Sequence, residues 1–79
     1  MTKGELLVIK AQAYAERTGE GAGYWLKLHL CDGKMLYGAC HKPEQGIMRM
    51  DIYTEEGVNY AEPVWVDLGC VTHVQIDWS

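Results

Sequence analysis

Cysteine and histidine are residue types that can bind metals or act in catalysis, and each occurs three times in this chain. Zinc sites generally need about four such ligands in tetrahedral geometry. His29 and Cys31 lie just before Asp32-Gly33, and Cys40 lies near the far end of the segment that returns from it. At about 3.3 Å per residue along a strand, roughly 20 Å separates Cys31 from Cys40. We therefore expect no metal centre and no other cofactor.

Catalysis by a nucleophilic side chain also has little support. A reactive cysteine needs a nearby histidine or cation that stabilises its thiolate. Cys70 and His73 flank a tight connector and could approach one another, and the sequence leaves their reactivity open. Ser79 is the only serine and the last residue, which argues against a serine nucleophile. Glu55 and Glu56 fall in a predicted turn, where exposed carboxylates rarely catalyse reactions. The sequence therefore predicts a protein that is not an enzyme.

The aromatic residues give a clearer indication of function. Phenylalanine is absent, so tryptophan and tyrosine supply the aromatic bulk. Trp25 and Trp65 each lie opposite the main apolar row of their segment. Either they pack beneath loops or at a bend where the alternation switches, or they form a binding surface, as such residues often do at interfaces. The candidate binding residues are Trp25, Arg49, Asp51, Tyr53, Tyr60 and Trp65.

Composition excludes several classes of protein. The chain has 79 residues and a formal charge of −4, which predicts a single domain spanning residues 1–79. Non-specific nucleic-acid binding is disfavoured, since it needs a concentrated stripe of Lys and Arg. The odd number of cysteines argues against a disulfide framework, and the N-terminal apolar run of four residues is too short for a signal peptide or a membrane span. We expect a cytoplasmic protein that does not act at membranes.

An Asp-Gly pair marks the most distinct hairpin of the sequence. Residues 24–31 and 34–40 alternate apolar with polar or amphipathic side chains on either side of Asp32-Gly33. Both central residues of a type I′ turn need positive φ, which Asp-Gly accommodates. We therefore predict two antiparallel strands, with Cys31 facing Lys34 across the turn.

Further strands are predicted downstream of this hairpin. Residues 47–54 alternate with their methionines inward, and residues 58–67 form the next strand after a turn at Glu55–Gly57. Pro63 within that strand suggests a sheet edge or a break. A last strand near the C-terminus places Trp78 inward.

The segment before the first glycine-rich loop is compatible with two structures. From Leu7 to Glu16 every odd position is apolar, which favours a strand. Thr2-Lys3-Gly4-Glu5 also fits a capping box ahead of an apolar run, which would begin a helix instead. If this segment is a strand, the chain consists of regularly spaced short strands. That pattern predicts an all-β fold, a small five- or six-stranded antiparallel barrel.

Two stretches of the chain resemble the small barrels of Sm-like proteins. Residues 25–38 resemble the first Sm-like motif, with alternation into an Asp-Gly turn and a glycine, Gly38, on a strongly bent strand. Residues 64–76 are similar to the strand, tight turn and strand that end Sm-like and SH3-like barrels. The resemblance implies an SH3-like or Sm-like barrel. Residues 47–51 and 67–70 lack that family's RNA-contacting residues, and Sm-like proteins begin with a helix where the alternation here favours a strand.

These observations favour a small non-enzymatic binding or adaptor module that acts through protein–protein contact as a homo-oligomer. A small-ligand-binding barrel with Arg49 or Lys27 as a polar anchor is an alternative. Another is a phage or mobile-element accessory protein whose acidic surface inhibits a host protein. Sm-like RNA binding is the alternative that the sequence favours least.

Overall fold

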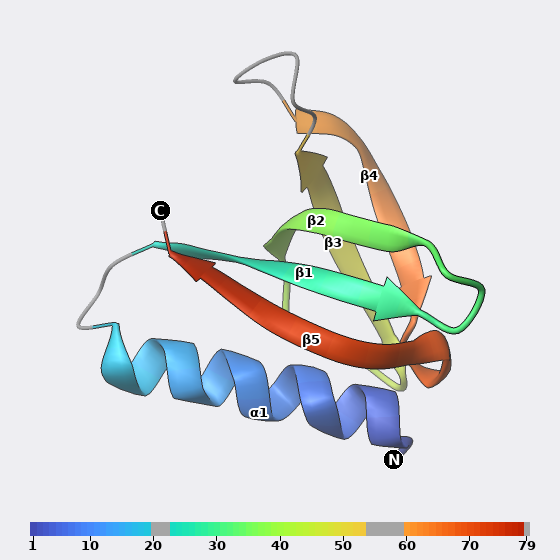
Figure 1. The fold of residues 1–79 in the computed structure, drawn as a ribbon, viewed down its shortest axis with the longest axis horizontal. Coiled ribbons are helices and arrows are strands. Elements are labelled where there is room, and N and C mark those ends of the chain that lie inside the picture. The colour runs from blue at the N-terminus through green and yellow to red at the C-terminus, as the bar shows by residue number, and fades with distance from the viewer. Residues whose placement is uncertain (20–22, 54–59, 79) are drawn as a thin grey trace.

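One helix precedes all of the strands in the computed structural model of the chain (Figure 1). The elements are α1 (Lys3–Thr18), β1 (Tyr24–Leu30), β2 (Met35–Cys40), β3 (Ile47–Tyr53), β4 (Tyr60–Asp67), the short 3-10 helix η1 (Leu68–Cys70) and β5 (Val71–Trp78). The structure describes residues 1–19, 23–53 and 60–78. The turn predicted at Glu55–Gly57 therefore lies outside the described residues.

The N-terminal segment is a helix, so the strand favoured for residues 7–16 is wrong. The Thr2 hydroxyl caps α1 by accepting a hydrogen bond from the Glu5 backbone N–H at 3.1 Å, as the helical alternative predicts. The buried side chains Val8 and Ala15 lie two helical turns apart. Alanines carry most of the alternation at the odd positions, and alanine is a strong helix former that is depleted in strands. Within the described residues, no helix is long and apolar enough to cross a membrane.

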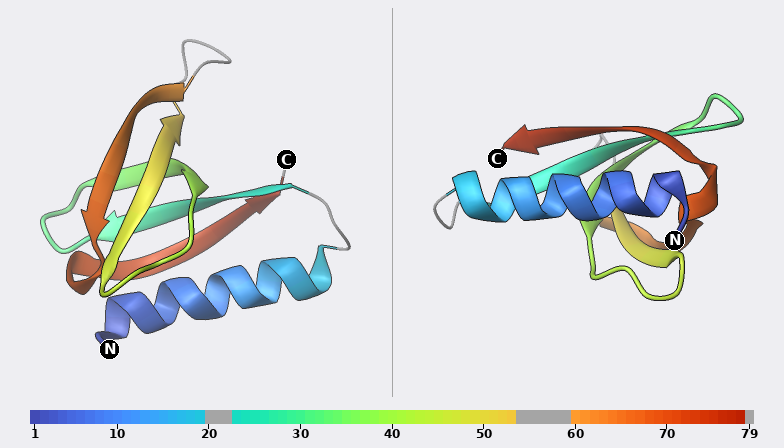
Figure 2. Two further views of the ribbon diagram at one scale, coloured as in Figure 1. Left: turned by 180° about the vertical axis from the view of Figure 1, so that it is seen from behind. Right: turned by 90° about the horizontal axis from the view of Figure 1, so that it is seen from below.

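The five strands form one antiparallel sheet in the order β4-β3-β2-β1-β5. β3 and β4 run steeply across the direction of β1 and β5, so the sheet is strongly bent, and α1 lies alongside β5 (Figures 1 and 2). The edge strands β4 and β5 are not paired with each other, and the sheet does not close. The predicted all-β barrel is therefore corrected to an α+β fold with an open sheet. Because residues 3–18 form the helix, the described chain has no sixth strand to join the two edges.

The Asp-Gly hairpin is confirmed, but its register differs by one residue from the prediction. Leu28 pairs with Leu36, and the Lys34 carbonyl accepts a hydrogen bond at 2.8 Å from the residue before Cys31. The loop therefore has three residues instead of two. Gly33 adopts a φ of 89° there, whereas Asp32 does not have a positive φ, so the turn is not type I′. This register sets the core residue Leu28 opposite Leu36 and Leu26 opposite Gly38.

The hydrophobic core lies between the inner face of the sheet and α1. Its buried members are Val8, Leu26, Leu28, Met48, Met50, Val66, Leu68 and Val71. The two methionines of β3 point inward as the alternation predicts. Trp78 is 44% exposed, so its predicted inward position is only partly met. Its ring meets the Tyr24 ring edge-on, with the ring centroids 6.2 Å apart, and lies close to Gly19 at the end of α1.

The start of α1 lies against η1 with no room for a side chain between the two backbones. A Cβ atom on Gly4 would lie 1.8 Å from the Leu68 carbonyl oxygen and 2.8 Å from that of Val71. The Leu68 N–H donates to the Gly46 carbonyl at 2.8 Å, and the Gly46 N–H donates to the Glu5 carboxylate at 2.7 Å. These contacts fix α1, the loop before β3 and the β4–β5 connection to one another.

β2 and β3 make a second close approach at Gly38. A Cβ atom there would lie 2.2 Å from the Asp51 carbonyl oxygen. Gly38 is buried and pairs with Leu26 on one side and with Ile52 on the other. A larger residue at this position would push β2 and β3 apart.

We expect Gly4→Ala to destabilise the protein by about 1–3 kcal/mol, because the added methyl group cannot be accommodated without moving α1 away from η1. In an unconstrained helix the same change stabilises by about 0.5–1 kcal/mol, so the sign of the effect is diagnostic. Urea unfolding followed by circular dichroism measures the difference. Lys10→Ala, at an exposed position of the same helix, is the control with little expected effect. A Gly4→Ala variant as stable as the wild type would contradict the close approach.

Candidate functional site

The outer face of β3 and β4 carries an exposed tryptophan beside an arginine. Arg49 and Trp65 are directly opposite each other in the β3–β4 ladder. Met48 and Val66, their neighbours in sequence, are buried, so the alternation sends Arg49 and Trp65 outward. Trp65 is 65% exposed, and Ile47 on the same face is 50% exposed. This pair of large apolar side chains is open to solvent, which is unusual for residues of their size.

A groove runs beside Trp65, between the outer face of β3–β4 and the loop that precedes β3. Its volume is about 410 Å³, and it is lined by His41, Lys42, Glu44, Gln45, Ile47, Arg49 and Trp65. We call it the Trp65 groove. A second hollow of about 500 Å³ shares Ile47 and Trp65 and extends to Thr2 and Gly69. The exposed apolar pair therefore stands between two concave surfaces.

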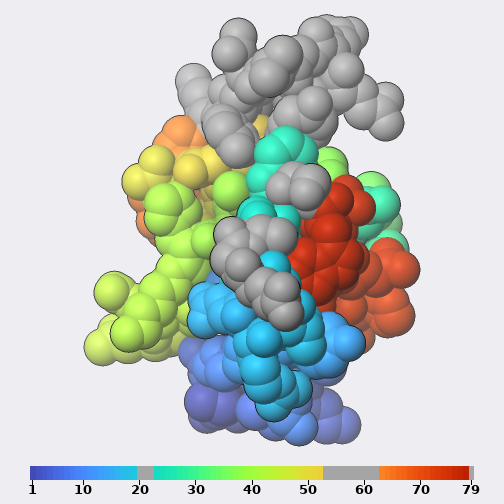
Figure 3. Space-filling model, turned by 90° about the vertical axis from the view of Figure 1, so that its left-hand side faces the viewer, coloured from blue at the N-terminus to red at the C-terminus, as the bar shows by residue number. Residues whose placement is uncertain are grey.

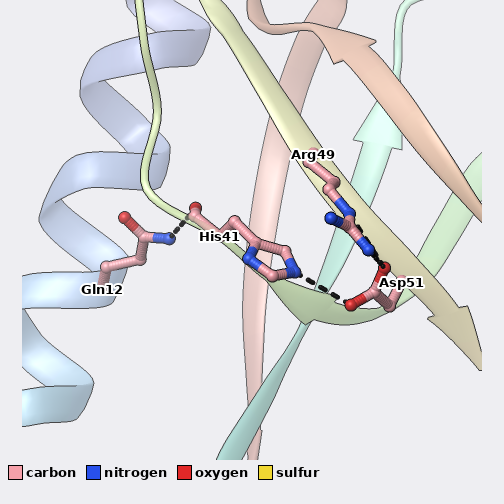
Figure 4. Close-up of polar contacts among 4 residues, drawn as sticks. All are labelled: Gln12, His41, Arg49 and Asp51. Carbon is pink, nitrogen blue, oxygen red and sulfur yellow. Dashed lines mark hydrogen bonds and ion pairs between the residues drawn. The ribbon is translucent and has the colours of Figure 1, made fainter.

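Arg49 and Asp51 form a charged cluster with His41 at one side of the Trp65 groove (Figure 4). The His41 Nε2 atom lies 2.9 Å from the Asp51 carboxylate, and the Arg49 guanidinium lies 3.2 Å from it. The hydrogen bond from His41 and the positive charge of Arg49 lower the pKa of Asp51 below its usual value. Arg49 is therefore already engaged within the chain, which reduces its availability as an anchor for an anionic ligand.

The loop that walls the groove is held in place by α1. Gln12 of α1 donates from its side-chain amide to the His41 carbonyl at 3.2 Å (Figure 4). Glu44 and Ile47 exchange two backbone hydrogen bonds of 2.8 and 2.9 Å around a two-residue turn. In that turn Gln45 has a φ of 51° and Gly46 a φ of 81°, which are type I′ values. The loop projects beside α1 in Figure 3.

Trp25 belongs to a different part of the outer face. It lies on β1, which β2 and β3 separate from β4. Its ring contacts Tyr37 of β2 edge-on at 5.4 Å, and Trp25 is only partly exposed. The Tyr37 hydroxyl donates to the Asp77 carboxylate, and the Lys27 ammonium lies 5.4 Å from the Tyr37 ring centroid. Trp25 thus packs within its own chain, whereas Trp65 is largely open.

The structure brings some of the sequence-predicted site residues together and leaves others apart. Arg49, Asp51 and Trp65 lie side by side on β3 and β4. Tyr53 and Tyr60 are opposite each other in the β3–β4 ladder, and their side chains lie outside the described part of the chain.

Sequence reasoning missed five of the seven residues that line the groove, namely His41, Lys42, Glu44, Gln45 and Ile47. The alternation that places Met48 inward also places Ile47 outward, so Ile47 could have been found. His41 follows β2, and nothing in the sequence indicates on which face of the sheet its side chain lies. Only the close approach of β2 and β3 brings it to Asp51.

Cys70 and His73, which the sequence left open as a reactive pair, each have a different neighbour in the structure. The His73 ring contacts the His29 ring edge-on, with centroids 5.1 Å apart. Cys70 has Cys31 as its neighbour instead, and this thiol raises the pKa of Cys70. Burial raises the pKa of Cys40 to about 12, so this thiol is unreactive near neutral pH. Among the described residues, no group of three or more His, Cys, Asp or Glu is placed to hold a metal ion.

Comparison of the chain with protein-family models, with curated proteins and with solved structures finds no match.

We expect Asp51→Asn to lower stability at neutral pH and to have no effect in acid. A carboxylate whose pKa is lowered by folding contributes stability above its unfolded pKa, and this contribution is lost as the pH falls through the folded value. Urea midpoints of wild type and variant are compared near neutral pH and well below the ordinary pKa of aspartate. The expected difference at neutral pH is at most about a few tenths of a molar, because the pair is solvent-accessible.

Asp32→Asn is the matched control in the exposed β1–β2 turn. The side-chain oxygen of Asp32 accepts a hydrogen bond from the Lys34 N–H at 3.0 Å, and the amide oxygen of an asparagine at this position can still accept it. If Asp51→Asn changes the midpoint equally at both pH values, the carboxylate charge is not the cause.

Proposed function

We propose that this protein is a non-enzymatic contact module that associates with a second copy of itself through β4 and the outer face around Trp65. The observation that carries the proposal is Trp65, a tryptophan 65% exposed at the edge of an open sheet. Large aromatic side chains dominate binding energy when a partner buries them. Ile47, exposed on the adjacent strand, extends the same apolar surface.

The edge position of β4 supports this proposal. β4 is the last strand of the sheet order on one side, and within the described residues no strand pairs with its outer edge. An edge strand presents unpaired N–H and C=O groups that can add a strand from another chain. Pro63 lies in β4 opposite Asp51, and proline is tolerated at a sheet edge because it has no N–H to donate. Side chains of a strand added at β4 would lie next to Trp65 on the outer face of the extended sheet.

The contacts of Trp25 give the two tryptophans unequal roles. Trp25 already packs against Tyr37, which supports the interpretation of ordinary packing for this residue. Trp65 has no comparable aromatic contact among the described residues. The self-association surface is accordingly centred on β4 and not on β1.

The groove volumes of about 410 and 500 Å³ fall within the range of small-molecule sites, which keeps a small-ligand function as the second candidate. Both hollows are on the outer surface. In the first hollow, Arg49 is the side chain that could bind an anionic ligand, but it is already ion-paired with Asp51. These features favour a protein partner over a small molecule.

We expect Trp65→Ala to weaken self-association by at least about tenfold, because removing a central aromatic side chain typically costs more than about 1.4 kcal/mol of binding. Trp25→Ala should weaken it less. Sedimentation velocity over a concentration series measures the mass and the dissociation constant.

Tyr14→Ala is the matched control, since Tyr14 is an aromatic residue 51% exposed on α1, away from β4. It should leave the dissociation constant unchanged. A wild-type chain that stays monomeric at every accessible concentration would contradict self-association, and equal effects of Trp65→Ala and Tyr14→Ala would contradict its location.

A further inference from the structure

Cys31 and Cys70 lie side by side at one end of the sheet, although they are far apart in sequence. Leu30 and Val71 are partners in the antiparallel β1–β5 ladder. Continuing this register by one residue sets Cys31 opposite Cys70. The Cys31 N–H donates to the Cys70 carbonyl at 2.7 Å, which confirms that the two backbones remain adjacent beyond the last paired residues.

The hydrogen-bonded backbones of Cys31 and Cys70 bring the two residues close enough for a disulfide to be considered. Directly opposed residues of an antiparallel pair have Cα atoms about 4.5–5.5 Å apart. Disulfides need a Cα separation of about 4.4–6.8 Å and side chains that point toward each other. The Cys31 thiol is also the main cause of the raised pKa of Cys70, which agrees with the two side chains being neighbours.

The three cysteines differ in how accessible they are to a reagent. Cys31 is exposed, Cys70 is partly exposed, and both belong to the described part of the chain. Cys40 lies on the inner side of β2, packed against the core. An odd number of cysteines is therefore accounted for by one close pair and one core thiol.

We propose that Cys31 and Cys70 are a redox-active dithiol that low-molecular-weight disulfides, such as glutathione disulfide, oxidise to an intramolecular disulfide. The Cys31 thiolate attacks one sulfur of glutathione disulfide, which forms a mixed disulfide and releases one glutathione thiolate. The Cys70 thiolate then attacks the Cys31 sulfur and releases the second glutathione. The two protein thiols lose two electrons and two protons, and glutathione disulfide is reduced to two molecules of glutathione.

Neighbouring charges set the pH dependence of this reaction. The neighbouring Cys31 thiol raises the pKa of Cys70 most, followed by desolvation and then by the negative charges of Asp67 and Asp32. Asp67 precedes η1, and Asp32 lies in the β1–β2 turn, where the Lys34 ammonium is 4.0 Å from its carboxylate. Because the thiolate is the reacting form, oxidation should accelerate as the pH rises and more thiolate forms.

The bond would add a covalent link beside the β1–β5 ladder, between the β1–β2 loop and the end of η1. Cys31 begins the β1–β2 loop, and Cys70 ends η1, against which α1 begins. A cross-link between them closes a long loop of the unfolded chain, which stabilises the folded state. The oxidised protein should therefore melt at least about 5 °C above the reduced protein.

The experiment equilibrates the full chain in glutathione buffers of increasing oxidised fraction, stops exchange by alkylation, and maps the tryptic peptides by mass spectrometry. Cleavage after Lys27, Lys34 and Arg49 separates the three cysteines into different peptides, since Lys42 precedes a proline and is resistant. Wild type and Cys40→Ala are expected to give a peptide pair joined through Cys31 and Cys70. Cys31→Ser and Cys70→Ser should instead stop at a mixed disulfide with glutathione.

The wild-type result decides the proposal, even if a variant fails to fold. Joined peptides containing Cys31 and Cys70 within one chain, with the raised melting temperature, support it. Glutathione adducts without this cross-link, a cross-link that includes Cys40, or disulfides that only join two chains would each overturn it.

Discussion

The contact between Gly4 and the backbone of η1 is the constraint on which the rest of this structure depends. No side chain fits between α1 and the carbonyl oxygen of Leu68, so the helix begins directly on the connection between β4 and β5. Leu68 is fully buried and also anchors the loop before β3 through Gly46. One short 3-10 turn thereby positions the helix, the groove loop and both edge strands. Changes at this point would propagate to all of them.

The surface proposed for self-association follows from how the core is filled. Burial of Met48, Met50 and Val66 on the inner face requires their neighbours Arg49 and Trp65 to face outward. The loop tied to α1 through Gln12 and Glu5 then gives this face one wall and makes it concave. The groove is accordingly a consequence of helix docking and of strand alternation together. Neither feature produces it alone.

The dithiol and the contact surface are separate parts of the molecule. Cys31 and Cys70 lie where β1 ends and β5 begins, whereas Trp65 lies on β4 at the opposite edge of the sheet order. η1 connects them, since Cys70 ends it and β4 leads into it. Oxidation of the pair would therefore act on the same junction that positions β4. This arrangement offers a physical route by which the redox state could influence association.

Alternation of apolar and polar residues determined most of the strands and the outward direction of Trp65, because that pattern depends only on which face of a strand is buried. The sequence also contained the Thr2 cap of α1, but an alternating row of alanines favoured a strand there, and packing of Val8 into the core decided for a helix. Only the tertiary structure set the register of the hairpin and placed Cys31 beside Cys70. Both depend on pairing between segments that local pattern leaves free to shift, and it is the shared core that fixes them.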